Sequence, residues 1–414
     1  MILFPLTRLG VGGEMANPCK VALISHSYIE SASRQKLAFL SQATNFQLIT
    51  PCWYPTPYGR YDVDREFHQN VPVKSYPIFF PHFKRTSTRW LLRSRDLGLS
   101  EFSPNIIHIE NEQHSWIVCQ TLLYRKMFAP AAKIIVFLWN NLQEHGVKAR
   151  LLEHLAQLNR RFIDFFICGN VAGKEILIAK GIPADAVEVL PQYGVDPDIF
   201  HPYSDERIEL TRAMLGIQRQ EFTIGFVGRF VEEKGLLDLV EAAGRLRQLS
   251  KRRICLLLTG KGGLESKLRA DCARLDIKLI LLSGRRYHEM AEVMNVLDVL
   301  VLPSQSKRFW KEQFGRVLIE AMACGVPVIG SDSGEIPNVI GEAGLTFHEC
   351  NRQELAECLR LCCENESFRL TLRDRGIARV LNKYTNQQIA YRTLEIYDRL
   401  LVTHEVKGGV PQNI

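Results

Sequence analysis

Residues 223–263 read TIGFVGRFVEEKGLLDLVEAAGRLRQLSKRRICLLLTGKGG, and this stretch decides the fold. The apolar runs 223–227 and 254–258 are predicted as β-strands, and residues 236–249 between them as an α-helix. Glycine-containing turns, GRFVEEKG and GKGG, follow the two strands. A repeated strand–helix order of this kind is typical of a Rossmann-like, doubly wound α/β domain.

The same alternation extends in both directions along the chain. Residues 106–109 and 134–138 are apolar throughout, which indicates strands buried on both faces of a parallel sheet. Further strands are predicted at 21–25, 46–50, 162–167, 277–282, 299–302 and 326–329. The helices expected among them lie at 33–39, 171–180, 264–275, 290–296 and 315–324.

A loop-like segment interrupts this rhythm and marks a domain boundary. Residues 190–202 contain three prolines and a glycine, which indicates a linker, and a chain of 414 residues favours two domains. We predict two Rossmann-like domains that face a central cleft, with ligands at the carboxyl ends of the strands. The expected divisions are an unstructured extension at 1–14, an acceptor domain at 15–203, a donor domain at 204–388, a helix packing back on the first domain at 389–405, and a tail at 406–414.

The composition is that of a globular chain. Hydrophobic residues make up 46% and charged residues 23%. No run approaches the ~20 apolar residues of a membrane-spanning helix. The eleven cysteines form no C-x-x-C pair, which favours reduced thiols and a cytoplasmic location.

The net charge of +7 is unevenly distributed. One short segment contains five of the cations: Lys84, Arg85, Arg89, Arg93 and Arg95. With its aromatic residues, the segment 79–95 suggests peripheral contact with an anionic membrane or capture of a lipid-diphosphate acceptor. The alternative is a surface helix whose apolar face packs on the first domain. Aromatic repeats and zinc-finger spacing are missing, which argues against nucleic acid as a partner.

The residues with the clearest chemistry lie at 304–334, SQSKRFWKEQFGRVLIEAMACGVPVIGSDSG. Glu312 falls in a polar loop, and Glu320 in an otherwise apolar helix, where a carboxylate is costly unless it is hydrogen-bonded. Ribose hydroxyls would satisfy Glu320. The helix entrance at Phe314-Gly315 would point backbone N–H groups toward a phosphate. The alternative is a charged loop followed by one solvated glutamate.

This passage closely resembles the retaining nucleotide-sugar glycosyltransferases of family 4, which have the GT-B architecture. Their Glu-x7-Glu signature matches Glu312 and Glu320. Their Gly-Arg after the first strand of the donor domain matches Gly228-Arg229, and their lysine before glycine matches Lys234-Gly235. The resemblance covers residues 223–347 strongly and the first half of the chain weakly.

The resemblance implies a role for each matched residue. Arg229 and Lys234 would grip the donor diphosphate and stabilise the charge on the leaving nucleotide, as a metal does elsewhere. Glu312 would hold hydroxyls of the transferred sugar as a third catalytic residue, and Glu320 would bind the ribose. Further donor contacts are expected at Gly228, Phe314, Gly315, Arg316 and Arg285, although Arg285 also fits a plain turn.

No metal site and no cofactor are expected. No Asp-x-Asp metal motif lies at the end of a predicted strand. Asp62-Val-Asp64 lies in a Tyr-Gly-Arg-rich loop and is predicted to be surface. The glycines of 260–263 match neither a P-loop nor G-x-G-x-x-G. They are predicted as a tight turn whose backbone lies near the donor.

The first half departs from the family in two places. The first strand ends in Ser25-His26 where many members have Gly-Gly, and Trp139-Asn140 stand where many have a histidine. The resemblance therefore supplies no catalytic histidine. Candidate contacts with acceptor or sugar are His26, His108, Glu110, His114, Trp139 and Asn140. The alternative for the histidines is a satisfied structural group, and for Glu110 a solvated loop.

The resemblance, together with these residues, implies a retaining, metal-independent hexosyltransferase. It would move a sugar from a nucleoside diphosphate to a saccharide or lipid-linked acceptor, in polysaccharide or glycoconjugate synthesis. A non-catalytic nucleotide-sugar-binding protein and a nucleotide-sugar epimerase are the alternatives. The expected location is the cytoplasm, with peripheral contact at the inner face of the membrane. The sequence leaves the base, the sugar, the acceptor and the oligomeric state open.

Overall fold

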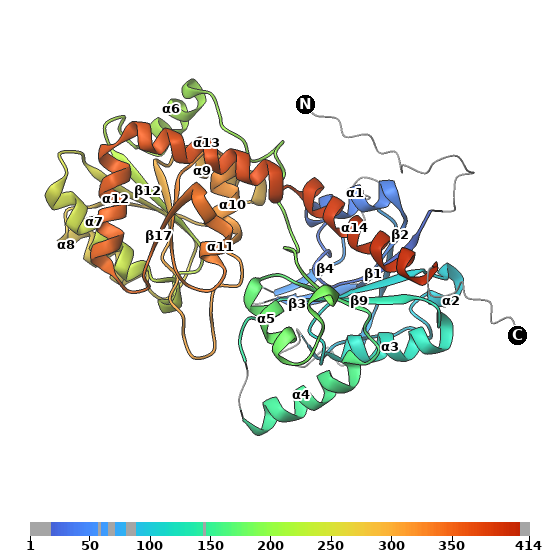
Figure 1. The fold of residues 1–414 in the computed structure, drawn as a ribbon. Coiled ribbons are helices and arrows are strands. Elements are labelled where there is room, and N and C mark those ends of the chain that lie inside the picture. Colours follow the sequence, from blue (N-terminus) through green and yellow to red (C-terminus); the bar gives the residue numbers. More distant parts are fainter. Residues whose placement is uncertain (1–17, 57–58, 65–70, 80–87, 144–145, 406–414) are drawn as a thin grey trace, which may run out of the picture. The chain divides into compact units, whose positions relative to one another are not determined.

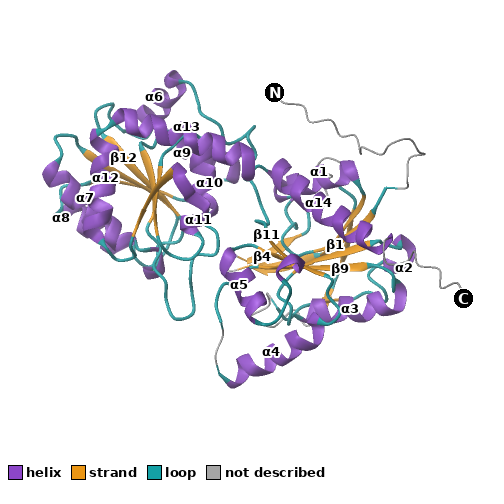
Figure 2. Ribbon diagram, in the orientation of Figure 1, coloured by secondary structure: helices purple, strands orange, loops and turns teal. Residues whose placement is uncertain are grey.

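The computed structural model contains two α/β units, each built around its own parallel sheet (Figure 1). The structure describes residues 18–56, 59–64, 71–79, 88–143 and 146–405. Unit 2 consists of residues 170–172 and 194–388, and unit 1 of the other described residues. In both units the helices lie outside the sheet (Figure 2).

Unit 1 has a seven-stranded parallel sheet with the strand order β11-β10-β9-β8-β1-β2-β5. Its strands are β1 (Lys20–Ile24), β2 (Asn45–Pro51), β5 (Val73–Tyr76), β8 (Ile106–Glu110), β9 (Lys133–Leu138), β10 (Phe165–Cys168) and β11 (Val187–Val189). Its helices are α1 (Gln35–Ala43), α2 (Leu99–Phe102), α3 (Trp116–Phe128), α4 (Val147–Arg160) and most of α5 (Val171–Ala179) and α14 (Asn386–Glu405). Two short antiparallel pairs accompany the sheet: β3 (Trp53–Thr56) with β4 (Gly59–Asp62), and β6 (Ile78–Phe79) with β7 (Leu91–Leu92).

The sheet of unit 1 is covered on both faces, which explains its wholly apolar strands. Successive strand residues point to opposite faces. Ile107 of β8 belongs to a core with Ile117 and Val118 of α3, whereas Ile106 belongs to a second core with Ile389 and Tyr397 of α14. Both alternate sets must therefore be apolar.

Unit 2 has a six-stranded parallel sheet with the order β14-β13-β12-β15-β16-β17. Its strands are β12 (Phe222–Val227), β13 (Ile254–Thr259), β14 (Lys278–Leu282), β15 (Val299–Leu302), β16 (Val328–Ser331) and β17 (Gly344–Phe347). Its helices are α6 (Asp205–Met214), α7 (Leu236–Leu249), α8 (Glu265–Arg274), α9 (Met290–Asn295), α10 (Arg316–Ala323), α11 (Ile336–Ile340), α12 (Arg352–Glu364) and α13 (Glu366–Lys383). The chain order of these strands is that of a Rossmann fold.

The predicted α/β class with two Rossmann-like, doubly wound domains is confirmed. Single elements differ at their ends. The strand predicted at 162–167 begins at Phe165, because Phe162 is exposed in the turn after α4. Strands β5, β11 and β17 and helices α3, α4 and α13 are among the elements that were not predicted.

Several predictions fall wholly or partly outside the described residues. These are the extension at 1–14, the tail at 406–414, and residues 80–87 of the basic segment with Lys84 and Arg85. The described part of that segment contains the strand β7 and no helix. Its Arg93 guanidinium lies 5.5 Å from the centre of the Phe79 ring.

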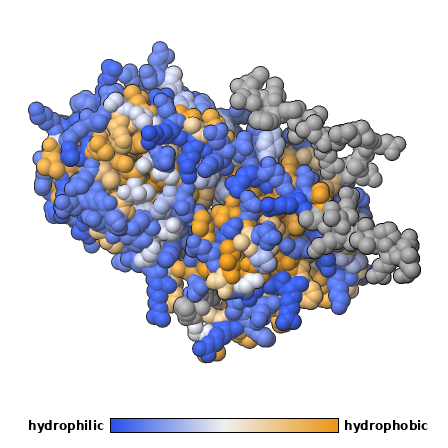
Figure 3. Space-filling view, viewed as in Figure 1, coloured by the Kyte–Doolittle hydropathy of each residue, from blue (hydrophilic) through white to orange (hydrophobic). Residues whose placement is uncertain are grey.

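The surface, the helices and the cysteines of the structure can be compared with the composition of the chain. Hydrophilic residues cover most of the face shown in Figure 3, with hydrophobic residues exposed between them. Within the described ranges, no helix is long and apolar enough to cross a bilayer, and no three His, Cys, Asp or Glu side chains gather as metal ligands. All eleven cysteines are free thiols, and most of them are buried.

Candidate functional site

The strand order of unit 2 favours a ligand site at the carboxyl ends of β12 and β15. These two strands are neighbours, but the chain leaves β12 toward β13 on one side and β15 toward β16 on the other. Where connections diverge in this way, ligands of doubly wound sheets bind outside the strand ends. The predicted residues 228–234 follow β12, and Glu312 follows β15.

Gly235 brings the loop after β12 against the end of β15. Its φ is +66°, and a Cβ at this position would lie 1.8 Å from the carbonyl oxygen of Pro303. Only glycine fits such a conformation and such a close approach. The backbone N–H of Gln305 also donates to the carbonyl of Glu233 at 2.8 Å. Lys234 is therefore held beside the end of β15.

Lys234 and Glu312 form an ion pair at this place. Lys234 Nζ lies 2.6 Å from Glu312 Oε2, and Ser304 Oγ donates to the same oxygen at 2.7 Å. The Lys234 ammonium also lies 4.7 Å from the centre of the Trp310 ring. The side chains of the pair are only 14% and 11% exposed. Burying charged groups to this degree costs free energy unless an opposite charge or a hydrogen-bond donor lies beside them.

The loop after β16 holds the backbone of Glu312. Gly334 has a φ of +56°, and a Cβ there would lie 2.0 Å from the carbonyl oxygen of Glu312. The same carbonyl accepts the backbone N–H of Glu335 at 3.2 Å. In addition, Ser331 Oγ donates to the carbonyl of Ser304. Three strand ends therefore position this carboxylate.

Arg229 lies at the end of β12 but is much more exposed. Its side chain is 56% exposed and makes a 3.4 Å contact with Glu233. Such an exposed pair is worth little free energy. The preceding Gly228 donates its N–H to the carbonyl of Thr259 at 3.0 Å, which fixes the backbone. The guanidinium can therefore turn toward a bound anion.

Glu320 lies on α10, one turn after Arg316. Arg316 Nε is 2.9 Å from Glu320 Oε1, and the guanidinium stacks 4.5 Å from the centre of the Tyr287 ring. Burial raises the pKa of Glu320, and the charge of Arg316 acts in the opposite direction. Burial also raises the pKa of Tyr287 to about 12. The predicted ribose carboxylate thus already has Arg316 as a partner.

Phe314 and Gly315 lead into α10, as predicted for the helix entrance. Gly315 is the N-cap residue with a φ of +77°. Phe314 is buried, and its ring centre lies 5.9 Å from that of Tyr384. The backbone before α10 is therefore anchored by packing.

The two other predicted donor elements lie on the β13–β14 side of the sheet. Arg285 follows the edge strand β14 and is exposed. The glycine turn 260–263 follows β13, and a Cβ at Gly260 would lie 1.9 Å from the carbonyl oxygen of Gly228. That turn thus packs directly against the loop that carries Arg229.

Two of the predicted acceptor residues, Glu110 and His108, are buried in unit 1. The Glu110 carboxylate accepts hydrogen bonds from Tyr28 at 2.9 Å, Lys36 at 3.2 Å and Gln192 at 2.7 Å. His108 Nδ1 lies 2.8 Å from the hydroxyl of Tyr397 on α14. Glu110 is therefore not in a solvated loop, and the positions of both residues favour structural roles.

His26 follows β1 and packs among aromatic rings. Its ring centre lies 4.4 Å from that of Tyr54 and 5.6 Å from that of Trp90. Burial lowers the pKa of His26 to about 4. The imidazole is consequently neutral near pH 7, as a packed structural histidine would be.

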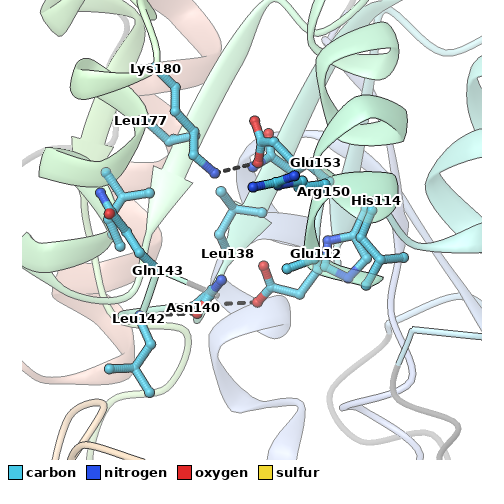
Figure 4. Close-up of a pocket in the computed structure, with 15 residues that line it drawn as sticks. Glu112, His114, Leu138, Asn140, Leu142, Gln143, Arg150, Glu153, Leu177 and Lys180 are labelled. Atoms are coloured by element: carbon cyan, nitrogen blue, oxygen red, sulfur yellow. Dashed lines mark hydrogen bonds and ion pairs between the residues drawn. The ribbon is translucent and has the colours of Figure 1, made fainter. Parts of the chain in front are cut away.

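His114 and Asn140 line a pocket of about 270 Å³ in unit 1 (Figure 4). Glu112 shares this lining and accepts the backbone N–H groups of Trp139 at 3.1 Å and Asn140 at 3.0 Å. The Trp139 indole donates instead to Gln192 at 2.8 Å. Across the pocket, α4 and the residue after α5 supply Arg150, Glu153 and Lys180 (Figure 4). The structure thus brings His114 and Asn140 together, but not with His108 or Glu110.

The segment that holds the donor-side residues also matches a known family. Residues 207–379 match the model of the glycosyl transferases group 1. The C-terminal half of the chain thus matches the group 1 glycosyltransferases. All the donor-binding residues predicted from the sequence lie within the matched segment.

Curated relatives extend this match without covering the whole chain. The chain is 29% identical over 225 residues to a D-inositol 3-phosphate glycosyltransferase of Corynebacterium jeikeium, covering 52% of each protein. It is 28% identical over 271 residues to the N,N'-diacetylbacillosaminyl-diphospho-undecaprenol alpha-1,3-N-acetylgalactosaminyltransferase of Campylobacter jejuni, covering 62% of this chain and 67% of that protein. The chain therefore spans about half to two thirds of the length of these relatives.

The fold has solved counterparts. The crystal structure of HepE from Anabaena in complex with UDP has a TM-score of 0.71 and 19% sequence identity. The match covers 92% of this chain and 100% of that one. The two Rossmann-like domains thus have the GT-B architecture.

Four residues within the matched segment 207–379 contact or support the predicted donor-site residues but were not predicted from the sequence. Ser304 and Trp310 contact the Lys234–Glu312 pair, and Gly334 supports it. Ser304 is the first polar residue after the predicted strand 299–302, a signal that could have identified it. Tyr287 gave no such signal, because its contact with Arg316 depends on how the short 3-10 helix Tyr287–Glu289 packs beside the start of α10.

Proposed function

We propose that the protein is a retaining glycosyltransferase of family 4, which transfers a sugar from a nucleoside diphosphate. The observation that carries this proposal is the 2.6 Å pair of Lys234 and Glu312 at the carboxyl ends of β12 and β15. It lies at the topological switch point of a doubly wound sheet, where ligands bind. It also lies within the segment matched to the group 1 glycosyltransferases.

The two cations of the site suit a leaving diphosphate. An ammonium has three hydrogen-bond donors, so Lys234 can hold Glu312 and a phosphate oxygen together. Arg229 is exposed and weakly paired, and its planar guanidinium suits a phosphate group. Negative charge grows on the diphosphate as the glycosidic bond to the sugar breaks. Fixed cations stabilise that charge, and metal independence is part of this proposal.

The two carboxylates would bind the sugars of the donor. Glu312 is held by three strand ends, and we assign it to hydroxyls of the transferred sugar. Glu320, with Arg316 at 2.9 Å, would accept hydrogen bonds from the ribose. The free-energy cost of burying a carboxylate is smaller when hydroxyl groups donate hydrogen bonds to it.

The acceptor would bind in the 270 Å³ pocket of unit 1, beside His114 and Asn140. The names of the two relatives above specify a phosphorylated polyol and a diphosphate-linked lipid. Arg150 and Lys180 in the pocket lining suit a phosphate-bearing saccharide or lipid. Peripheral membrane contact through 79–95, with the exposed or half-exposed cations Arg89, Arg93 and Arg95, remains part of the proposal.

A thermal-shift panel of UDP, GDP and ADP tests the donor assignment first. A ligand at 100 times its Kd adds about 2.7 kcal/mol to the free energy of unfolding. The nucleotide that stabilises the protein then defines the sugar donors for a transfer assay, with NMR of the anomeric configuration of the product. No stabilisation by any nucleotide would refute the donor site. An inverted product would refute retention, and donor binding without transfer would favour the non-catalytic alternative.

A further inference from the structure

The loop after β15 contains a tight turn that presents an aromatic ring to the candidate donor site. The backbone N–H of Lys307 donates to the carbonyl of Trp310 at 2.7 Å, and the N–H of Trp310 donates to the carbonyl of Lys307 at 3.1 Å. These hydrogen bonds close residues 307–310 into a four-residue turn, which we call the 307–310 turn. Its two aromatic side chains differ in their surroundings. Phe309 is 80% exposed, whereas Trp310 is half-buried beside Lys234.

Both ends of the 307–310 turn are anchored. Before the turn, Ser306 Oγ donates to Glu349 Oε1 at 2.6 Å. After it, the backbone of Glu312 is held by the loop that follows β16, as described above. The ring of Trp310 is therefore carried by a fixed piece of backbone.

The Lys234 ammonium has two partners among the described residues. Glu312 Oε2 lies 2.6 Å from Nζ, and the centre of the Trp310 ring lies 4.7 Å from it. An aromatic ring attracts a cation through its quadrupole, so no single N–H group has to meet an acceptor atom. Because an ammonium has three N–H groups, Lys234 can keep both partners and still donate to a phosphate oxygen.

Holding Lys234 in place before the donor binds would raise donor affinity. A free lysine side chain samples many rotamers, and fixing it when a ligand binds costs conformational entropy. That cost is smaller when the side chain already has its binding conformation in the free protein. Glu312 holds the ammonium too, but we assign its carboxylate to hydroxyls of the incoming sugar. The Trp310 ring has no such second task in the proposed site.

We propose that Trp310 is a positioning residue, which holds the Lys234 ammonium where it binds the donor diphosphate. This inference rests on the proposed function, because it takes Lys234 as a diphosphate ligand. A ring that only fills space in the loop would have a different consequence. A positioning residue acts through Lys234, so its effect on donor affinity should disappear once Lys234 has been removed.

A double-mutant cycle measured by calorimetry tests this coupling. UDP, GDP and ADP are titrated into the full chain, and the nucleotide that binds is used for the variants. Trp310→Leu should bind it at least about fivefold more weakly, because the cation–π contact is lost. Trp310→Phe should stay within about twofold of wild type, because a phenyl ring also attracts a cation. Lys234→Ala/Trp310→Leu should bind as weakly as Lys234→Ala.

Phe309→Ala is the matched control, since it removes an exposed aromatic ring from the same turn. It should bind the nucleotide like wild type. Melting curves without nucleotide check the fold of each variant, and Trp310→Met, which also lacks a ring, is the substitute if Trp310→Leu does not fold.

Three results would overturn the inference while leaving the donor site standing. These are wild-type affinity in Trp310→Leu, equal losses in Trp310→Leu and Trp310→Phe, and a further loss when Trp310→Leu is added to Lys234→Ala. The last two would indicate that the indole contacts the donor directly or supports the loop. Wild-type affinity in Lys234→Ala, or no nucleotide binding at all, would instead refute the diphosphate assignment, and this inference with it.

Discussion

Lys234 Nζ and Glu312 Oε2 lie 2.6 Å apart, although 78 positions separate the two residues in the chain. Their meeting depends on two features of the fold. Strands β12 and β15 are neighbours in the sheet, and Gly235 allows the backbone to approach Pro303. Each residue is therefore the electrostatic partner of the other as well as a candidate ligand for the donor.

Replacing Lys234 by alanine should weaken donor binding and turnover. Loss of one charge-assisted contact costs about 1.5–3 kcal/mol, or roughly 10- to 150-fold in affinity. The variant also leaves the buried Glu312 carboxylate without the positive charge beside it, so the melting temperature should fall as well. Donor affinity from calorimetry and melting curves would measure the two effects.

Two further variants separate donor binding from stability. Lys234→Ala/Glu312→Gln removes both charges and should regain melting temperature without regaining donor affinity. Arg229→Ala should weaken donor binding while leaving the melting temperature unchanged, because Arg229 is exposed and weakly paired. Donor affinity within twofold of wild type in both Arg229→Ala and Lys234→Ala would show that neither cation binds the diphosphate.

Transfer activity should survive an excess of EDTA. If Arg229 and Lys234 supply the positive charge for the leaving diphosphate, no divalent ion has to do so. The measurement is the initial rate with and without chelator, at saturating donor. A complete loss of activity that Mg²⁺ restores would contradict the proposed mechanism.

The loss of Glu320 should appear mainly in the donor KM. The ribose does not react, so its contacts contribute uniform binding energy to ground state and transition state. Glu320→Gln should therefore raise KM and leave kcat near the wild-type value. A fall in kcat with unchanged KM would place Glu320 at the reacting sugar instead.

The same variant should show a pH-dependent gain in stability. Burial raises the pKa of Glu320 in the folded protein above the ~4.3 of an unfolded chain. The folded state then binds the proton more tightly, so wild-type stability falls as pH rises through this raised pKa. Glutamine has no carboxyl group to ionise, so the stability of Glu320→Gln does not fall in this way. Its melting temperature should exceed that of wild type at about pH 7, and the difference should shrink toward about pH 4.

The sequence predicted the buried strands better than it predicted where elements begin and end. The apolar runs of 106–109 and 134–138 predicted buried parallel strands, because burial on both faces leaves no place for polar side chains. Ends of elements were less predictable. Phe162 reads as a strand residue but lies exposed in a turn, since the hydrophobicity of one residue does not say whether anything covers it.

The donor side of the site was more predictable than the acceptor side for a physical reason. Lys234 and Glu312 lie in the loops after two neighbouring strands, β12 and β15, so the topology of the sheet places them at the same edge. The surroundings of His108 depend on Tyr397, which lies 289 positions away on α14. No local pattern shows that a distant helix will cover a strand and bury its polar residues.

Buried His108 should make the protein less stable in mild acid. Burial lowers its pKa to about 4, while Nδ1 faces Tyr397 and Nε2 has no hydrogen-bond partner among the described residues. A lowered pKa contributes stability above the unfolded value of ~6.5, and that stability is lost as pH falls toward the folded value. For this shift, the free energy of unfolding should be about 2 kcal/mol lower near pH 5 than near pH 7.

A variant without the imidazole is the control for that measurement. His108→Gln should be less stable than wild type near pH 7, but its stability should depend less steeply on pH in this range. Nearby Glu110 and Lys36 also influence His108, so the slope and not the absolute stability is compared. Equal slopes for wild type and variant would show that His108 does not titrate separately in the two states.

The last prediction concerns Glu312, whose replacement should change the kinetics in a different way from the replacement of Glu320. Glu312 is assigned to the sugar whose bonds change, so part of its interaction should strengthen in the transition state. Glu312→Gln should chiefly lower kcat, by about 10²-fold or more if it resembles other lost transition-state contacts. Glutamine keeps the shape of the side chain and can still accept the hydrogen bond of Ser304, so the fold should persist. If Glu312→Gln kept the wild-type kcat in a folded protein, the pair with Lys234 would be structural, and the proposed function would lose the observation that carries it.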